Sequence, residues 1–456
     1  MIKVLLFSGI KLTPFIVTLL FTLNINKALL FKIRHFEVWI FILLILVSLL
    51  SIIASARKHK CIKNVETIVF IILLTCNCIF FLQNHFQYLN YKKVVFNTDP
   101  VQIRRLGKHF IMGYSNETFH EIKKLVETGG LGGVYLTRRN FEGKTFFDIK
   151  KEIALLQSIQ KKNGYPPLLV AADHEGGIVS RVSPPLTRLP GLANLVNTST
   201  DKTSLQKKIE GYATIQSVEL SEIGINVNLS PVVDLKTSVQ HNVNVHTRID
   251  LRSISGDVTT ITDVAMIYSL VLEENGVIPT LKHFPGLGRV TQDTHLFTGT
   301  LDKKSEDLSE TDWLPFKKIS KKTGAFIMLG HVLLTDADNT DLVSYSKKII
   351  TGVIRNKWQH NGVLITDDLN MGPIANSEEG IGGISVKALN AGVDLLLLSY
   401  DGEQYYKAVY ELIDAENQGR LDRDFLAESS RRLDRAISVM QRRKGQMNQK
   451  RTVFNN

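Results

Sequence analysis

Eight short apolar segments alternate with amphipathic segments of helical periodicity through most of this chain of 456 residues. Near-continuous apolar strands that alternate with helices are typical of a parallel sheet covered on both faces. Eight such units favour an α/β fold of the (β/α)8 TIM-type barrel over a doubly wound open sheet, which usually has fewer strands. We assign the barrel to residues 98–445. The predicted strands are His109–Tyr114, Gly133–Thr137, Pro167–Asp173, Ile225–Asp234, Val277–His283, Gly324–His331, Gly362–Asp367 and Asp394–Ser399.

Helical patterns fill the intervals between these strands. The predicted helices are Glu117–Thr128, Asp148–Lys162, Ser204–Ile223, Val258–Asn275, Leu314–Lys322, Lys347–Gln359, Ile384–Ala391 and Gln404–Ala415, with a last helix over Arg423–Lys444. Residues 446–456 are predicted to form a basic polar tail.

Polar, potentially reactive side chains end five of the predicted strands. The carboxyl ends of barrel strands form the active-site face, so these side chains are expected to converge there. A single Asp at a strand end often only caps the next helix, but five polar ends on one face point to a site. These residues are Asp173, Asp234, Lys282 with His283, His331 and Asp367.

Three apolar runs precede the barrel, over Val4–Leu23, Val38–Ala56 and Ile68–Leu82. A soluble domain rarely contains three such runs in series, so residues 1–92 are predicted to form a membrane region with two to three transmembrane helices. If all three runs span the membrane, the positive-inside rule favours a cytoplasmic N-terminus, because the basic cluster at residues 57–63 then lies inside. The inside flanks hold one more Lys or Arg residue than the outside flanks. We therefore expect a cell-membrane protein with an extracytoplasmic barrel, whereas two spans would place the barrel inside.

The net charge of +11 does not by itself indicate a nucleic-acid partner. Part of the excess lies beside the apolar runs and near the C-terminus, and no aromatic residues are interleaved with it as in nucleic-acid surfaces. All three cysteines, Cys61, Cys76 and Cys78, fall in the predicted membrane region. The barrel is therefore expected to have neither a disulfide framework nor a thiol nucleophile. No His/Cys cluster has metal-ligand spacing, so no metal and no cofactor are expected.

The segment from Lys282 to His295 carries the strongest chemical signal. It begins at a strand end, continues through a Pro-Gly-x-Gly turn and closes with Asp293-Thr-His295. In an extended loop the side chains of Asp293 and His295 would point the same way. The carboxylate could then hold one ring nitrogen and leave the other for proton transfer. The glycines predict a loop that closes over the substrate like a lid.

From about Gln102 to Arg443 the chain resembles glycoside hydrolase family 3, and more narrowly its single-domain exo-β-N-acetylglucosaminidases of peptidoglycan turnover. The motifs that carry the resemblance occur in the family's order. They are Ala172-Asp-His-Glu-Gly-Gly-Ile-Val-Ser-Arg181, Leu229-Ser-Pro-Val-Val-Asp234, Leu251-Arg-Ser-Ile-Ser255, Lys282 to His295, Ile365-Thr-Asp-Asp-Leu-Asn-Met371 and Ala388-Leu-Asn-Ala-Gly-Val-Asp394.

The resemblance implies a retaining β-N-acetylhexosaminidase that forms a covalent intermediate on Asp367 and uses His295, oriented by Asp293, as the acid/base. Asp368 competes with Asp367 on sequence alone and is assigned a supporting role. The expected partners are a GlcNAc-containing glycan and, through the N-terminal helices, a lipid membrane, and the catalytic domain is expected to be monomeric. The implied sugar-binding residues are Asp173, Arg252, Lys282 and His283, with weaker cases for Arg181 and His331.

The sequence departs from the family pattern at three positions. Leu287 stands where the family usually has His, Arg289 where it has Asp, and His174 where it has Gln. These differences bear on loop closure and on the substrate. Three alternatives therefore stay open: a β-glucosidase, a GlcNAc phosphorylase, or a catalytically inactive membrane sensor that binds muropeptides.

Overall fold

The computed structural model describes residues 2–24, 33–34, 36–59, 65–237 and 246–455. The chain divides into two compact units, residues 1–97 and residues 98–456. Lys60 and Lys63, which belong to the basic cluster at residues 57–63, lie outside the described residues, and so does Cys61.

The first unit consists of α1 (Ile2–Asn24), α2 (Glu37–His59) and α3 (Val65–Asn97). Aromatic rings hold these helices together: Phe15 stacks on Phe70 with ring centroids 4.8 Å apart, and Phe41 stacks on Phe81 at 3.9 Å. The side-chain amide of Asn77 donates a hydrogen bond to the Phe15 carbonyl at 3.2 Å, so this polar group is satisfied inside the unit.

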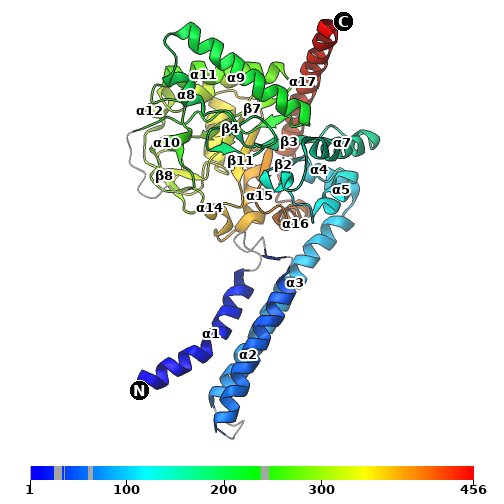
Figure 1. The fold of residues 1–456 in the computed structure, drawn as a ribbon, viewed down its shortest axis with the longest axis vertical. Helices are drawn as coiled ribbons and strands as arrows, with labels where there is room; N and C mark the ends of the chain where they lie inside the picture. Colours follow the sequence, from blue (N-terminus) through cyan, green and yellow to red (C-terminus); the bar gives the residue numbers. More distant parts are fainter. Residues whose placement is uncertain (1, 25–32, 35, 60–64, 238–245, 456) are drawn as a thin grey trace. The chain divides into compact units, whose positions relative to one another are not determined.

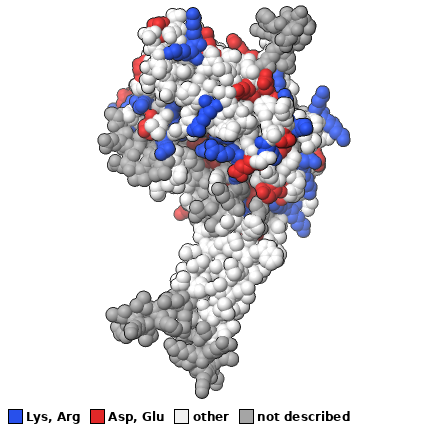
Figure 2. Space-filling view, viewed as in Figure 1, with Lys and Arg blue, Asp and Glu red and all other residues white. Residues whose placement is uncertain are grey.

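Among the described residues, one helical stretch, Thr67–Asn97, is long and apolar enough to cross a membrane by length and composition. The apolar stretches Leu12–Asn24 and Glu37–Ile53 are shorter. The run Val38–Ala56 has no charged residue, but α3 is the longer continuous apolar helix. On the face drawn in Figure 2, charged side chains cluster on the second unit and are sparse along the helices of the first.

The second unit is a closed barrel of eight parallel strands, which confirms the predicted α/β barrel (Figure 1). The first and last strands of the barrel pair with each other, with Phe110 in register with Leu396. The sheet is therefore closed, which excludes the doubly wound open sheet. In spatial order the strands are β1 (Phe110–Gly113), β12 (Leu395–Leu398), β11 (Leu364–Asp368), β9 (Phe326–Leu329), β7 (Ile278–Phe284), β6 (Val227–Asn228), β3 (Leu169–Ala172) and β2 (Gly133–Leu136).

Helices precede, connect and follow these strands. The main ones are α4 (Pro100–Gly107), α5 (Phe119–Glu127), α7 (Phe146–Lys162), α9 (Lys202–Ile223), α11 (Val258–Glu274), α13 (Leu314–Ser320), η3 (Lys348–Lys357), α15 (Gly380–Asn390), α16 (Gln404–Asn417) and α17 (Arg423–Asn455). Three differ from prediction, and one of them, α4, was not predicted. The segment before β11, η3, is a π-helix rather than an α-helix, and the last helix continues through the predicted tail to Asn455.

The barrel interior is apolar and closed at one end by α17. Its strands contribute residues such as Leu169, Phe326 and Ile365, and Leu433, Ile437 and Met440 of α17 join the same cluster. These α17 residues pack beneath Ile278, the first residue of β7, and Val363, the residue before β11, so the helix covers the amino ends of the strands. Polar groups that converge on the barrel are therefore gathered at the opposite, carboxyl ends.

Two small sheets that the sequence did not predict extend the carboxyl end. An antiparallel hairpin, β4 (His174–Gly176) with β5 (Val179–Ser180), follows β3 directly. A parallel pair, β8 (Gly299–Leu301) with β10 (Val332–Leu334), links the segment after His295 to the segment after β9.

Candidate active site

Two adjacent carboxyl groups, Asp367 and Asp368, end β11 and have different surroundings. Asp368 accepts hydrogen bonds from the Ser399 hydroxyl at 2.5 Å, from the Asn370 side-chain amide at 2.9 Å, and from nearby backbone N–H groups. Within the described chain, Asp367 accepts one hydrogen bond, from the N–H of Asp368 at 2.8 Å. Asp368 thus fixes the strand end, while Asp367 keeps an oxygen available for another reactant.

Electrostatics keep Asp367 ionised. Burial alone would raise its pKa, but the imidazoles of His283, His331 and His295 and the N–H of Asp368 outweigh burial and hold the pKa of Asp367 below its ordinary value. Burial instead raises the pKa of Asp368. The two neighbouring carboxyl groups are therefore pushed in opposite directions, a difference that marks functional sites.

Lys282, near the end of β7, lies at the centre of a buried ionic cluster. Its side chain is 2% exposed, and Nζ lies 2.6 Å from a carboxylate oxygen of Asp173 and 2.6 Å from one of Glu175. The Tyr135 hydroxyl donates to the other oxygen of Asp173 at 2.8 Å. Burial would raise the pKa of Asp173, but Lys282 outweighs it and lowers that pKa. Asp173 is the more exposed of the two carboxylates, so it can still accept from a hydroxyl group of a ligand.

Arg252 and His283 continue the cluster toward Asp367. Arg252 donates to both oxygens of Glu175, at 2.9 and 2.7 Å, and its Nη2 lies 3.3 Å from Nε2 of His283. On its other side, Nδ1 of His283 lies 2.7 Å from the buried carboxylate of Asp234. Because each side chain is held on two sides, this part of the site is rigid before a ligand arrives.

His295 and Asp293 lie together, but not as the sequence predicted. Residues 294–296 form a turn, not an extended strand, and Asp293 uses its side chain to accept from the N–H of His295 at 3.1 Å. The direct distance between Asp293 Oδ1 and His295 Nδ1 is 3.4 Å. The Thr247 hydroxyl lies between them, 2.7 Å from that carboxylate oxygen and 3.0 Å from Nδ1. Burial lowers the pKa of His295.

In the predicted lid, the turn after β7, the first half is fixed by packing and by polar contacts. Leu287 is buried, and its N–H donates to Asp234 at 2.7 Å. A Cβ on Gly288 would lie 1.8 Å from the Leu235 carbonyl, so only glycine allows this approach. Arg289 forms an ion pair with the buried Asp312 at 3.0 Å. Leu287 and Arg289, the two loop residues that depart from the family pattern, therefore hold the loop in place, Leu287 by its burial and Arg289 by its ion pair.

The remaining predicted residues occupy less central positions. His331 is buried with both ring nitrogens engaged, Nδ1 2.8 Å from the Ser344 hydroxyl and Nε2 3.0 Å from the Asp368 carbonyl. Arg181 is exposed; its charge lowers the pKa of Asp173, and its backbone N–H donates to the Asp173 carbonyl at 3.0 Å. His174 is buried, and burial lowers its pKa to about 4, so it stays neutral.

Sequence reasoning missed three participants, Glu175, Tyr135 and Thr247, and gave a fourth, Asp234, no partner. Glu175 lies two residues after Asp173 in a motif already singled out, and period-two alternation could have paired the two carboxylates. Asp234 was noted as a polar strand end but given no partner. Tyr135 and Thr247 carry no local signal, because only the closed barrel brings them to their partners. Among the described residues, no group of three or more His, Cys, Asp or Glu side chains is arranged to hold a metal ion.

Known proteins resemble this chain at the level of sequence. A β-hexosaminidase of Glaesserella parasuis serovar 5 (strain SH0165) is 34% identical over 292 residues, which cover 63% of this chain and 78% of the relative. β-Hexosaminidase A of Pseudoalteromonas piscicida is 29% identical over 335 residues, covering 69% of this chain and 54% of the relative.

Solved structures resemble it as well. The glycoside hydrolase family 3 β-N-acetylglucosaminidase from Paenibacillus sp. str. FPU-7 superposes with a TM-score of 0.66 and 28% identity, covering 75% of this chain and 62% of that one. The chain thus spans about half of the Pseudoalteromonas relative and less than two thirds of the Paenibacillus protein. The family model described as the glycosyl hydrolase family 3 N terminal domain matches residues 96–436. Because that match includes every strand of the barrel and every residue of the candidate site, the chain belongs to glycosyl hydrolase family 3.

Proposed function

We propose that this protein is a retaining β-N-acetylhexosaminidase that releases terminal β-linked GlcNAc from peptidoglycan-derived or related glycans. The observation that carries the proposal is the environment of Asp367. It is a carboxylate at the carboxyl end of a barrel strand, held ionised by three histidines, with one oxygen free of protein partners in the described chain. Such a group is suited to attack an anomeric carbon. The names of the relatives support the same substrate class.

In the first step, an Asp367 oxygen forms a bond to the anomeric carbon as the bond to the glycosidic oxygen breaks. The imidazolium of His295 donates a proton to that oxygen, and the rest of the glycan departs as an alcohol. Most glycosidases use a second carboxylic acid here. An imidazole can replace it because its proton exchanges at physiological pH, and Asp293 stabilises the protonated form through Thr247.

In the second step, His295 is the base. Its neutral imidazole takes a proton from water, the water oxygen bonds to the anomeric carbon, and the ester bond to Asp367 breaks. Two inversions at one carbon leave GlcNAc with its original β configuration. The pKa of His295 is lowered by burial, which favours the neutral form needed for this step.

The terminal sugar is held by the ionic cluster beside Asp367. Asp173, Arg252, Lys282 and His283 supply charged donors and acceptors fixed before binding, so hydroxyl groups meet partners that need no reorganisation. We assign exposed Arg181, whose charge acts on Asp173, to contact with the sugar or its neighbour. His331 has both ring nitrogens occupied, and we assign it to positioning β11 rather than to contacting sugar.

We further propose that the N-terminal helices anchor a monomeric catalytic barrel to the cell membrane, with the barrel on the extracytoplasmic side. The length and apolar composition of α3 support membrane insertion. A reporter fused to the C-terminus, active on one side of the membrane, tests the orientation. Activity of a cytoplasm-dependent reporter would overturn the orientation but not the enzymatic proposal.

The enzymatic proposal is tested with the full-length chain in detergent and a chromogenic β-N-acetylglucosaminide. We expect turnover by the wild type and loss of it in D367A and H295A. The same assay with a chromogenic β-glucoside addresses a β-glucosidase. Added phosphate that yields GlcNAc 1-phosphate would identify a phosphorylase. Binding of GlcNAc without turnover on any donor would contradict the proposal and identify a sensor.

A further inference from the structure

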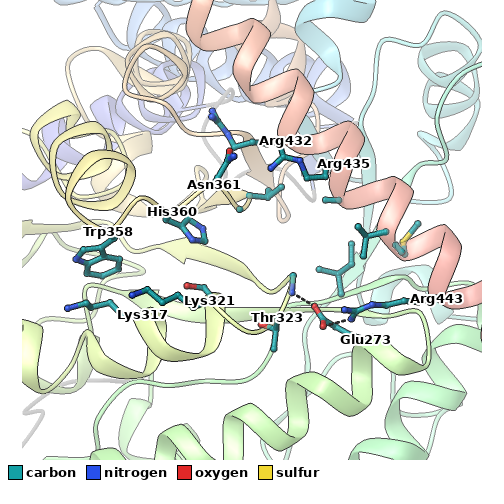
Figure 3. Close-up of a pocket in the computed structure, with 18 of the residues that line it drawn as sticks. Glu273, Lys317, Lys321, Thr323, Trp358, His360, Asn361, Arg432, Arg435 and Arg443 are labelled. Atoms are coloured by element: carbon teal, nitrogen blue, oxygen red, sulfur yellow. Dashed lines mark hydrogen bonds and ion pairs between the residues drawn. The ribbon is translucent and has the colours of Figure 1, made fainter.

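A cavity of about 700 Å³ opens at the amino end of the barrel, away from the strand ends that carry Asp367 and Lys282. It is lined by residues at or just before the starts of three strands, Ile278, Gly324 and Val363, and by one face of α17 (Figure 3). Its size lies in the range of sites for small organic ligands. Nothing in the proposed catalytic cycle uses this cavity.

The charge of the cavity lining is strongly basic. Six of the lining side chains are Lys or Arg and one is an acid, Glu273. Glu273 is already engaged by the Arg443 guanidinium and by the N–H of Gly324. The remaining basic residues are Lys317, Lys321, Lys357, Arg432 and Arg435. Among them Lys321, Lys357 and Arg435 make no ion pair with the described residues.

A buried, incompletely paired guanidinium adds a second, independent observation. Arg432 is 6% exposed, and its Nη2 has no hydrogen-bond partner in the described chain. Its Nε donates to the Asp394 carboxylate at 2.8 Å, and Arg355 donates to the same carboxylate at 2.7 Å. One negative charge is therefore shared by two guanidinium groups. Glu428 lies 3.6 Å from Nη1 and is half exposed, which screens its charge. Buried guanidinium groups are normally fully paired, so this one indicates a missing anion.

His360 supplies a neutral polar group to the same cavity. Its Nε2 is buried and has no hydrogen-bond partner among the described residues, and its ring faces the cavity in Figure 3. Val439 and Met440 of α17 add apolar surface to the lining, and the Trp358 ring lies beside Lys317. The cavity thus combines hydrogen-bond donors and cations with apolar surface.

We propose that this cavity binds an organic phosphate, with the phosphoryl group at Arg432 and Arg435 and the organic part along the Met440 and Trp358 walls. A phosphate monoester carries between one and two negative charges and several acceptor oxygens, and so matches a lining with several spaced cations. A single carboxylate would satisfy one guanidinium and leave the others unpaired. The apolar wall would be unused by inorganic phosphate alone, which favours an ester.

Isothermal titration calorimetry on the full-length chain in an uncharged detergent tests this proposal. The probes are inorganic phosphate, glycerol 3-phosphate and phosphatidylglycerol added to the micelles. We expect saturable binding of at least one organic phosphate, tighter than that of inorganic phosphate. Preference for glycerol 3-phosphate identifies a soluble ligand, and preference for phosphatidylglycerol identifies a lipid headgroup.

The variants R435E and K321E reverse charges that line the cavity, and we expect each to weaken binding about tenfold or more. The matched controls R431E and K322E reverse exposed charges that neighbour them in sequence but do not line the cavity. The controls are expected to bind within about twofold of wild type. Absence of binding by all three probes overturns the proposal. Equal weakening in the control and cavity variants also overturns it, because it would mean attraction by net charge alone.

Discussion

The Thr247 hydroxyl lies 3.0 Å from Nδ1 of His295. The same hydroxyl donates to Asp293 at 2.7 Å, so a three-membered chain links carboxylate, hydroxyl and imidazole. Thr247 is far from both partners in sequence, and its position depends on the segment that precedes α10 (Ile249–Arg252). The carboxylate therefore orients His295 partly through a residue that is not itself charged.

Replacing Thr247 by Val keeps the shape of the side chain and removes this link. We expect kcat/KM on a chromogenic β-N-acetylglucosaminide to fall roughly tenfold, because His295 loses the contact that fixes its ring and its tautomer. Thr247→Ser retains a hydroxyl and should stay close to wild type. Equal activity of the Val and Ser variants would contradict a role for the hydroxyl.

The two carboxyl groups at the end of β11 should respond differently to amide substitution. Asp367→Asn removes the nucleophile, and we expect kcat to fall by on the order of 10⁴-fold or more. Asp368→Asn keeps most of the shape but weakens the contacts to Ser399 and Asn370. Its expected effects are a lower melting temperature and a smaller kinetic loss. A covalent glycosyl adduct trapped with a 2-deoxy-2-fluoro sugar and located on Asp368 would reverse the assignment.

The pH profile of kcat/KM should reflect the lowered pKa values of two groups, Asp367 and His295. The pKa of Asp367 is held down by three histidines, so the acid limb of kcat/KM is expected below the ordinary Asp value of about 4. Cleavage requires protonated His295, whose pKa burial lowers, so activity should decline as pH rises through a value below about 6.5.

Asp293→Asn tests the assignment of the alkaline limb. The negative charge of Asp293 raises the pKa of His295 against burial, so its removal should move this limb to lower pH. A limb that keeps its position in Asp293→Asn would show that another group controls it.

Lys282 should contribute to stability as well as to sugar binding. Lys282→Met leaves the carboxylates of Asp173 and Glu175 without the buried ammonium between them, and we expect a loss of about 3 kcal/mol in the free energy of unfolding at pH 7. Lys282 lowers the pKa of both carboxylates, so its contribution is present above their unfolded pKa of about 4 and is lost as pH falls through the lower, folded values.

The stability deficit of Lys282→Met should therefore be smaller near pH 3 than at pH 7. Chemical denaturation at both pH values measures it, with Lys322→Met as an exposed control. A deficit that is independent of pH would indicate a packing defect instead of a lost ionic contribution.

The ion pair between Arg289 and Asp312 should control the loop that follows β7. Asp312 is buried, whereas Arg289 is about a third exposed, so Arg289→Ala leaves an unpaired buried carboxylate and is expected to cost about 2 kcal/mol. The loosened loop should also lower kcat/KM several-fold, since it continues into Asp293 and His295. Arg289→Lys, which retains the charge, should recover part of both losses. An unchanged kcat/KM in Arg289→Ala would show that this ion pair is not needed for catalysis.

Local patterns were sufficient to predict the barrel. Apolar runs such as Gly324–His331 and Asp394–Ser399, each separated from the next by a helical pattern, favour strands of a covered parallel sheet, and strand direction places Asp173, Lys282 and Asp367 at one end. The motif from Lys282 to His295 likewise identified the acid/base candidates, since both lie in one short segment. These conclusions depend on periodicity and short-range order, which a sequence displays directly.

Closure of the barrel decided the contacts across it. Glu175 meets Arg252 and Lys282, and Thr247 meets His295, because strands and loops distant in sequence end at the same face. The difference between Asp367 and Asp368 likewise depends on Ser399 and on histidines from three other segments. The sequence determined which reactive groups the chain carries and at which end of the strands they lie. The tertiary structure determined their partners and protonation, because hydrogen bonding and desolvation depend on distances that only packing sets.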